Sequence, residues 1–219
     1  MNKKIQSAKL RAPAVSRQRI SPVSFIEKTM WAALLLAVLL IWSVSVQAAT
    51  LSFTPSSQSV INGGSVDVSV VVSGLGDGAA DSLGAYDLNV SFDSALLSYT
   101  GIVFGDPVNG DQLNLGGSGT YTAATPAAGQ VNLVQLSFDS VALLNAAQAD
   151  SFVLAVLSFD AIDLGDSLMG FSGVVLSDAG GANLAASTTA GNISVIPVPA
   201  AFWLMLSALG ILRTFRTNR

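Results

Sequence analysis

The sequence predicts an all-β domain, an antiparallel β-sandwich of about nine short strands. Runs in which apolar and polar residues alternate recur between residues 50 and 196, as expected of strands with one buried face. Clusters of Gly, Asn and Asp, which favour turns, separate these runs. Only Val141–Ala149 has helical character, and it is long enough for one or two turns. Together these observations favour two packed sheets with a single helical crossover.

The alternation is clearest in Val66–Val72 and Tyr86–Phe92, where every second residue is apolar. Tyr86 lies on the apolar side of its run, so its ring is expected to point inward. The other strands are expected at Thr50–Thr54, Leu96–Phe104, Gly119–Ala124, Gln130–Phe138, Ser151–Ala161, Ser167–Leu176 and Asn192–Ile196. Turns are expected at Asn62–Gly64, Gly74–Gly78, Asn109–Asp111 and Asp178–Gly181.

Charge is divided unevenly along the chain. All 10 Lys and Arg residues lie before the first long apolar run or after the last one. Glu27 is the only one of the 14 acidic residues outside the middle region, which leaves 13 Asp and no Lys, Arg, His, Glu or Cys between Ala49 and Pro197. Such a region cannot neutralise a nucleic-acid backbone, so no nucleic-acid partner is expected. It also lacks most general bases, activated nucleophiles and soft metal ligands, so neither an enzyme nor a cofactor is expected.

Residues 1–48 have the features of an export signal with a long basic leader. Basic residues precede the apolar run Met30–Trp42, and Val46-Gln47-Ala48 places small residues where signal peptidase requires them. Cleavage is therefore predicted between Ala48 and Ala49. An uncleaved membrane anchor is the alternative, because the apolar run is longer than most signal sequences need.

Residues 197–219 form a second apolar end. Pro197, Val198 and Pro199 end the domain, Val198–Leu212 is apolar, and Arg213, Arg216 and Arg219 follow. This layout resembles the PEP-CTERM sorting tail of Gram-negative bacteria, although Val198 stands where the family name implies Glu. The resemblance implies recognition by exosortase, a membrane peptidase, and membrane attachment through the C-terminal helix. A plain tail anchor is the alternative. Because positive residues favour the cytoplasmic side, the acidic middle region is expected outside the cell, at the surface or in the extracellular medium.

The middle region, residues 49–196, resembles the cohesin domain, a nine-stranded jelly-roll relative of carbohydrate-binding modules. The resemblance rests on Leu51–Pro55, Gly63–Val70, Leu83–Asp93, Leu96–Leu97 and Leu154–Ala161 in that order. Cohesins bind dockerin modules through one flat sheet face. The resemblance therefore implies that Asp87 contacts a partner, with Asn89 and Ser91 on the same strand face. An Asp on a solvated strand face is the simpler interpretation of Asp87.

Calcium is a further candidate ligand. Asp160, Asp163 and Asp166 lie close together in the sequence, and Ca²⁺ prefers oxygen-rich loops. No Asp-x-Asp-x-Asp-Gly loop ending in Glu is present, and Asp is also a common turn residue.

The sequence thus favours an exported binding or scaffold module of the cell surface or extracellular matrix, with a dockerin-like protein or a polysaccharide as its partner. With Tyr86 inward, Tyr99 and Tyr121 are the tyrosines left to stack on sugars, which favours protein contact. The alternatives are a polysaccharide hydrolase using paired Asp, with two carboxylates about 5–10 Å apart, and a permanently membrane-anchored structural protein.

Overall fold

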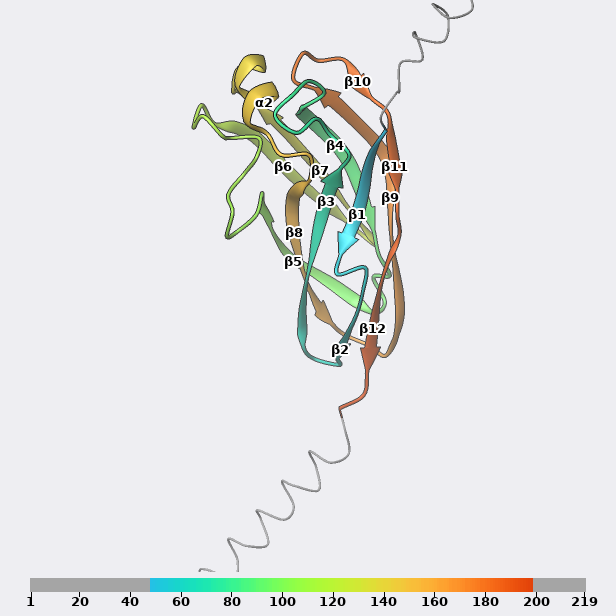
Figure 1. Cartoon of the computed structure of the whole chain (residues 1–219). Helices are drawn as coiled ribbons and strands as arrows, with labels where there is room; N and C mark the ends of the chain where they lie inside the picture. Colours follow the sequence, from blue (N-terminus) through green and yellow to red (C-terminus); the bar gives the residue numbers. More distant parts are fainter. Residues whose placement is uncertain (1–47, 199–219) are drawn as a thin grey trace, which may run out of the picture. The chain divides into compact units, whose positions relative to one another are not determined.

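Two β-sheets packed face to face form the domain (Figure 1). The computed structural model describes residues 48–198, so the export signal and the sorting tail lie almost wholly outside the described residues. Within residues 48–198 no helix is long and apolar enough to cross a membrane. The predicted β-sandwich is confirmed.

The smaller sheet has five strands in the order β11-β1-β3-β8-β5. Its central strand β3 pairs antiparallel with both β1 and β8. The strand bounds are β1 (Ala49–Thr54), β3 (Ser65–Ser73), β5 (Leu97–Phe104), β8 (Phe152–Ala161) and β11 (Ala186–Thr188).

The larger sheet has seven strands, six of them in the order β2-β12-β9-β4-β7-β6, with β10 paired to β9. Strand β4 lies near its centre, between β9 and β7. The strand bounds are β2 (Ser57–Ile61), β4 (Leu83–Ser91), β6 (Thr120–Ala127), β7 (Gln130–Ser137), β9 (Gly165–Asp178), β10 (Asn183–Leu184) and β12 (Gly191–Ile196).

Each of the nine predicted strands is present, with ends shifted by a few residues at most. Three short strands, β2, β10 and β11, were not predicted. The prediction of wholly antiparallel pairing was wrong at the sheet edges, because β11 pairs parallel to β1 and β2 pairs parallel to β12. In both exceptions an edge segment pairs with backbone groups of β1 or β12 that would otherwise be exposed.

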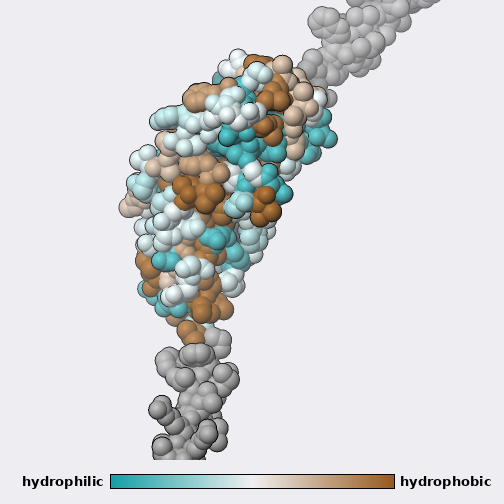
Figure 2. Space-filling view, turned by 90° about the vertical axis from the view of Figure 1, so that its left-hand side faces the viewer, coloured by the Kyte–Doolittle hydropathy of each residue, from teal (hydrophilic) through white to brown (hydrophobic). Residues whose placement is uncertain are grey.

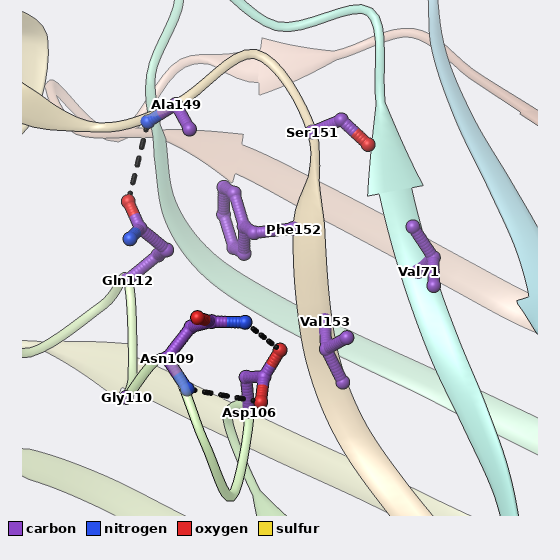
Figure 3. Close-up of a pocket in the computed structure, with 9 residues that line it drawn as sticks. All are labelled: Val71, Asp106, Asn109, Gly110, Gln112, Ala149, Ser151, Phe152 and Val153. Atoms are coloured by element: carbon purple, nitrogen blue, oxygen red, sulfur yellow. Dashed lines mark hydrogen bonds between the residues drawn. The ribbon is translucent and has the colours of Figure 1, made fainter.

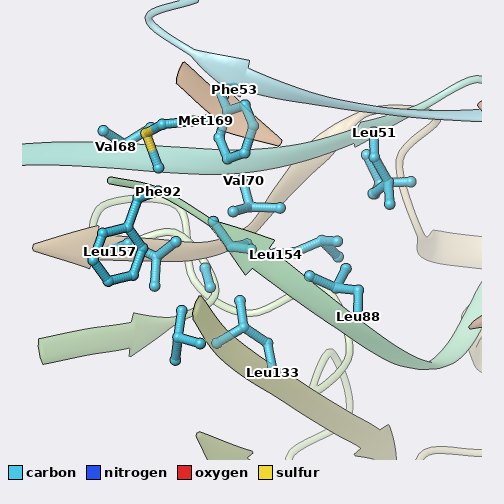
Figure 4. Close-up of a cluster of buried hydrophobic side chains, with 14 of the residues drawn as sticks. Leu51, Phe53, Val68, Val70, Leu88, Phe92, Leu133, Leu154, Leu157 and Met169 are labelled. Atoms are coloured by element: carbon cyan, nitrogen blue, oxygen red, sulfur yellow. The ribbon is translucent and has the colours of Figure 1, made fainter. Parts of the chain in front are cut away.

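The core lies between the sheets and is lined by alternate residues of each strand (Figure 4). Val68 and Val70 of β3 and Leu88 of β4 all belong to this core, and all three are buried. Phe53 stacks on Phe171 with ring centroids 4.2 Å apart. The inward position predicted for Tyr86 is confirmed, since its side chain is 2% exposed.

The predicted helical segment forms α2 (Val141–Ala147) between β7 and β8. The Ser140 hydroxyl accepts a hydrogen bond from the Leu143 N–H and so caps the first turn. Gln148, just after the helix, is buried. Its side-chain oxygen accepts a hydrogen bond from the Leu83 N–H, and its side-chain N–H donates to the Leu83 carbonyl oxygen. These bonds join the helix to the start of β4.

The two ends of the described domain lie far apart. Strand β1 starts at one end of the sandwich and β12 finishes at the other (Figure 1). Both strands are paired along their length, β1 with β3 and β12 with β9.

Candidate functional site

The outer face of β9, β4, β7 and β6 is the candidate binding surface. Strand β4 is at its centre, and its side chains alternate between the core and the solvent. Asp87, Asn89 and Ser91 all point outward, Asp87 being exposed and the other two half-buried. The structure therefore places the three sequence-predicted residues on one face, where they form a row along β4. Their role in binding stays a prediction.

Cross-strand neighbours hold the polar row in place. Asn132 of β7 lies opposite Asn89, and its side-chain N–H donates to Asp87 Oδ1 over 2.7 Å. On the other side, β9 has an irregular register beside Asp87 and Asn89. Gly173 in this bulge has φ +57°, and a Cβ there would lie 2.7 Å from the Asn89 amide nitrogen. The positive φ favours glycine at this position, and a larger residue would displace the Asn89 amide.

An apolar area adjoins the polar row on the same face. The register places Val175 of β9 opposite Asp87, and Tyr121 of β6 opposite Leu136 of β7. Val175 is 52% exposed, Tyr121 56% and Leu136 44%. The face thus combines hydrogen-bonding groups with exposed apolar side chains, a composition also found in protein interfaces. We call the polar row and these three residues the β4 face.

The β4 face ends in a shallow hollow of about 210 Å³ near α2. Ala85, Leu136, Asp139 and Asp178 are among the residues that line it. Hydrogen bonds from Gly116 and Ser118 lower the pKa of Asp139 below its usual value, so this carboxylate is charged at neutral pH. A positively charged or polar group of a partner would be favoured in this hollow.

A buried polar network supports the β4 face from behind. The Tyr86 hydroxyl lies 2.9 Å from Gln135 Oε1 and 3.2 Å from the Leu154 carbonyl oxygen. The Gln135 side-chain N–H in turn donates to Asp111 Oδ2 over 2.6 Å. Burial, and to a smaller extent the charge of Asp111, raises the pKa of Tyr86, so its hydroxyl stays protonated. The network ties β4, β7 and β8 to the loop after β5.

The predicted calcium ligands do not come together as a metal site. Asp160 accepts a hydrogen bond from Ser65, Asp163 from Leu164, and Asp166 from Ser194. Within residues 48–198, no group of three or more acidic, His or Cys side chains is arranged to hold a metal ion.

Sequence reasoning identified the β4 row but missed other parts of this surface, and it considered Tyr121 only as a possible platform for sugars. Leu136 and Val175 are predicted by no motif, because apolar residues on both faces of a strand also occur in buried strands. The role of Gly173 depends on a bulge, which alternation does not reveal. Gln135 falls on the inward side of β7, where a polar residue is unexpected.

Comparison of the sequence with models of known protein families gives no match, and comparison with curated proteins gives none either. Solved structures give a consistent result. A type I cohesin of Clostridium thermocellum, crystallised in a cohesin–dockerin complex, is 12% identical, with a TM-score of 0.54 over 68% of this chain and 99% of that one. The fold is cohesin-like.

Two further cohesins agree. The sixth cohesin from scaffoldin B of Acetivibrio cellulolyticus, crystallised with a dockerin, is 19% identical, with a TM-score of 0.53 over 68% of this chain and 99% of that one. A non-cellulosomal cohesin from the archaeon Archaeoglobus fulgidus is 14% identical, with a TM-score of 0.51 over 72% of this chain and 96% of that one. At these identities the similarity establishes the cohesin-like fold.

Proposed function

We propose that this chain is an exported, non-enzymatic binding module whose cohesin-like domain holds a dockerin-type protein partner on the β4 face. The observation that carries the proposal is the composition of that face. It joins a row of hydrogen-bonding side chains, from Asp87 to Ser91, to the exposed apolar side chains of Tyr121, Leu136 and Val175. Protein interfaces combine polar and apolar groups in this way. The cohesin-like fold, found in structures that were crystallised with dockerins, supports the same partner class.

Electrostatics favours binding over hydrolysis. A hydrolase with paired carboxylates needs one of them to have a raised pKa. The hollow at the end of the β4 face contains two carboxylates, but hydrogen bonds lower the pKa of Asp139, which is the opposite of what a general acid needs.

The binding test uses the immobilised full chain and a panel of purified dockerin modules. At least one dockerin is expected to bind. Asp87→Ala and Leu136→Asp should each weaken that binding by about tenfold or more, because they remove a hydrogen-bonding group and an exposed apolar side chain from the face. Asp160→Ala is the matched control, since Asp160 is also an exposed strand Asp paired with a polar neighbour, but on the other sheet.

Failure of every dockerin to bind would contradict the partner class. Binding that is unaffected by Asp87→Ala and Leu136→Asp would contradict the assignment to the β4 face.

Delivery to the surface is part of the proposal. Signal peptidase would cleave between Ala48 and Ala49, and exosortase would recognise the tail from Pro197 to Arg219. The described domain would then reach the cell surface or the extracellular matrix. The motivation is the layout of the two ends, each with an apolar run beside basic residues.

The test of delivery is the intact mass of the protein recovered from the bacterial surface and from the medium. A species that starts near Ala49 and ends near Pro197–Pro199 is expected. A chain that keeps its C-terminus in the membrane fraction would contradict sorting and indicate a tethered domain instead.

A further inference from the structure

A second recessed site lies on the other sheet, away from the β4 face. It is a cavity of about 410 Å³ beneath the loop that connects β5 to β6 (Figure 3). Val71 of β3 and Val153 of β8 are opposite each other on the outer side of the five-stranded sheet and form one wall. The loop lies on the left-hand side of the domain in Figure 1. Figure 2 shows this side, on which apolar and hydrophilic areas alternate.

The loop over the cavity is held in one conformation by Asp106. Its carboxylate accepts hydrogen bonds from the Val108 N–H, the Asn109 N–H and the Asn109 side-chain N–H, over 2.8–3.1 Å. Asp106 and Gly110 also exchange two backbone hydrogen bonds, of 3.0 and 2.9 Å. The carboxylate is thus engaged with its own turn, and the position of the Asn109 amide is set before any ligand arrives.

The remaining polar groups at the cavity have free hydrogen-bonding capacity. Gln112 Oε1 accepts from the Ala149 N–H over 3.2 Å, which fixes the orientation of the Gln112 amide. Among the described residues, no protein group bonds Gln112 Nε2, Asn109 Oδ1 or the Ser151 hydroxyl. The cavity therefore offers a donor, an acceptor and a hydroxyl that can act as either.

An aromatic ring lies between these polar groups. Figure 3 shows the Phe152 side chain extending from β8 toward the loop with Asn109 and Gln112, while Val153 extends the other way, toward Val71. Phe152 is half-buried and packs partly against the core, so its position is fixed. Sites for small molecules combine such apolar surfaces with a few well-placed polar groups in a cavity of about 300–1,000 Å³.

Charge restricts the class of ligand. There is no Lys, Arg or His between Ala49 and Pro197, so a phosphate, sulfate or uronate group would find no cation to pair with. Asp106 and the neighbouring Asp150 would repel such anions. A cation would find only one carboxylate among the lining residues, that of Asp106, whose oxygens already accept three hydrogen bonds. What fits is an uncharged molecule with an apolar face and hydroxyl groups at its edge.

We propose that this cavity binds a sugar ring of a neutral oligosaccharide or polysaccharide, with the ring against Phe152 and its hydroxyls bonded to Asn109, Gln112 and Ser151. The site lies on the opposite sheet from the β4 face and does not depend on the partner proposed there. A domain that binds both ligands would connect a protein to a neutral glycan.

Saturation-transfer difference NMR on the full chain tests this proposal, in a buffer free of sugar-based detergents. The probes are cellohexaose, maltohexaose, laminarihexaose and xylohexaose as neutral saccharides, and hexagalacturonate as an anionic one. We expect a signal from at least one neutral hexasaccharide and none from hexagalacturonate.

Two variants locate the binding. Gln112→Glu keeps the acceptor for the Ala149 N–H but removes the donor, and Ser151→Leu fills the cavity from an exposed position without removing a protein hydrogen bond. Each should lower the affinity about tenfold or more. The controls are Gln130→Glu on β7 and Ser69→Leu on the outer side of β3, which should bind as the unmodified chain does.

Three results would overturn the proposal. The first is the absence of a signal from all four neutral hexasaccharides. The second is unchanged affinity in both Gln112→Glu and Ser151→Leu. The third is binding of hexagalacturonate as strong as that of the neutral probes.

Discussion

The hydroxyl of Tyr86 lies 2.9 Å from the side-chain oxygen of Gln135, in the interior of the sandwich. Tyr86 comes from β4 and Gln135 from β7, and the two residues are opposite each other in the sheet register. Because both side chains are almost completely buried, neither can exchange this bond for one to water. The pair therefore fixes the two central strands of the β4 face relative to each other.

Tyr86→Phe should lower the free energy of unfolding by about 1–3 kcal/mol, because it leaves the Gln135 oxygen buried without its donor. Chemical denaturation of the two proteins measures this difference. Tyr121→Phe is the matched control, since Tyr121 is 56% exposed and its hydroxyl can bond water in either state. An equal effect of the two substitutions would contradict the importance of the buried bond.

Gln148→Leu should be more damaging than Tyr86→Phe. The Gln148 side chain, 1% exposed, bonds the Leu83 N–H, the Leu83 carbonyl and the Gln112 carbonyl. Leucine is similar in size but leaves these backbone groups without partners, which should cost about 2–5 kcal/mol. Chemical denaturation is again the measurement, with Gln130→Leu at a half-buried position of β7 as control. If Gln148→Leu were as stable as Gln130→Leu, the prediction would be wrong, and water would have replaced the lost hydrogen bonds.

Acid should remove the contribution of Asp139 to stability. Hydrogen bonds from Gly116 and Ser118 hold its pKa in the folded state below the usual 3.8. A carboxyl with a depressed folded pKa contributes stability above its unfolded pKa and loses it as the pH falls through its folded pKa. Asp139→Asn should thus be less stable than the unmodified chain at neutral pH, and the gap should close as the pH falls below 3.8.

Denaturation curves of both proteins at several pH values measure this gap. Asp163→Asn is the control, because among the described residues Asp163 accepts only the N–H of the next residue, Leu164. A gap between Asp139→Asn and the unmodified chain that is constant with pH would contradict the role of the Asp139 carboxylate.

Salt should stabilise the domain. Of the 14 acidic residues, all except Glu27 are Asp residues between Ala49 and Pro197. This region contains no Lys or Arg to offset their charge. Raising NaCl from about 0.01 M to about 0.5 M shortens the range of their mutual repulsion, so the melting temperature should rise. The double substitution Asp77→Asn and Asp81→Asn, in the exposed loop before β4, should make this rise smaller. A melting temperature independent of salt would contradict net repulsion in the folded state.

Alternation predicted the strands that form the core because burial of one face determines the pattern, as in β3 with Val66 to Val72. It failed for β11, where Ala186–Thr188 has no buried side chain and is held in the sheet by pairing with β1. It also failed for Gln135, whose burial depends on partners 24 and 49 residues away in the chain, Asp111 and Tyr86. Pairings between distant segments leave little trace in a single sequence.

The candidate sites divide in the same way. Strand alternation predicts that Asp87, Asn89 and Ser91 point outward, and the resemblance to cohesins marks this row as a candidate binding site. The cavity beside Phe152 was not predicted, because it is assembled from β3, β8 and the loop after β5, which no local pattern connects.

The positions of β1 and β12 determine how the domain would respond to mechanical force. Because β1 starts at one end of the sandwich and β12 finishes at the other, a pull on the two ends of the described domain acts along both strands. The hydrogen bonds of β1 with β3 and of β12 with β9 would be loaded together, in shear, and not opened one after another.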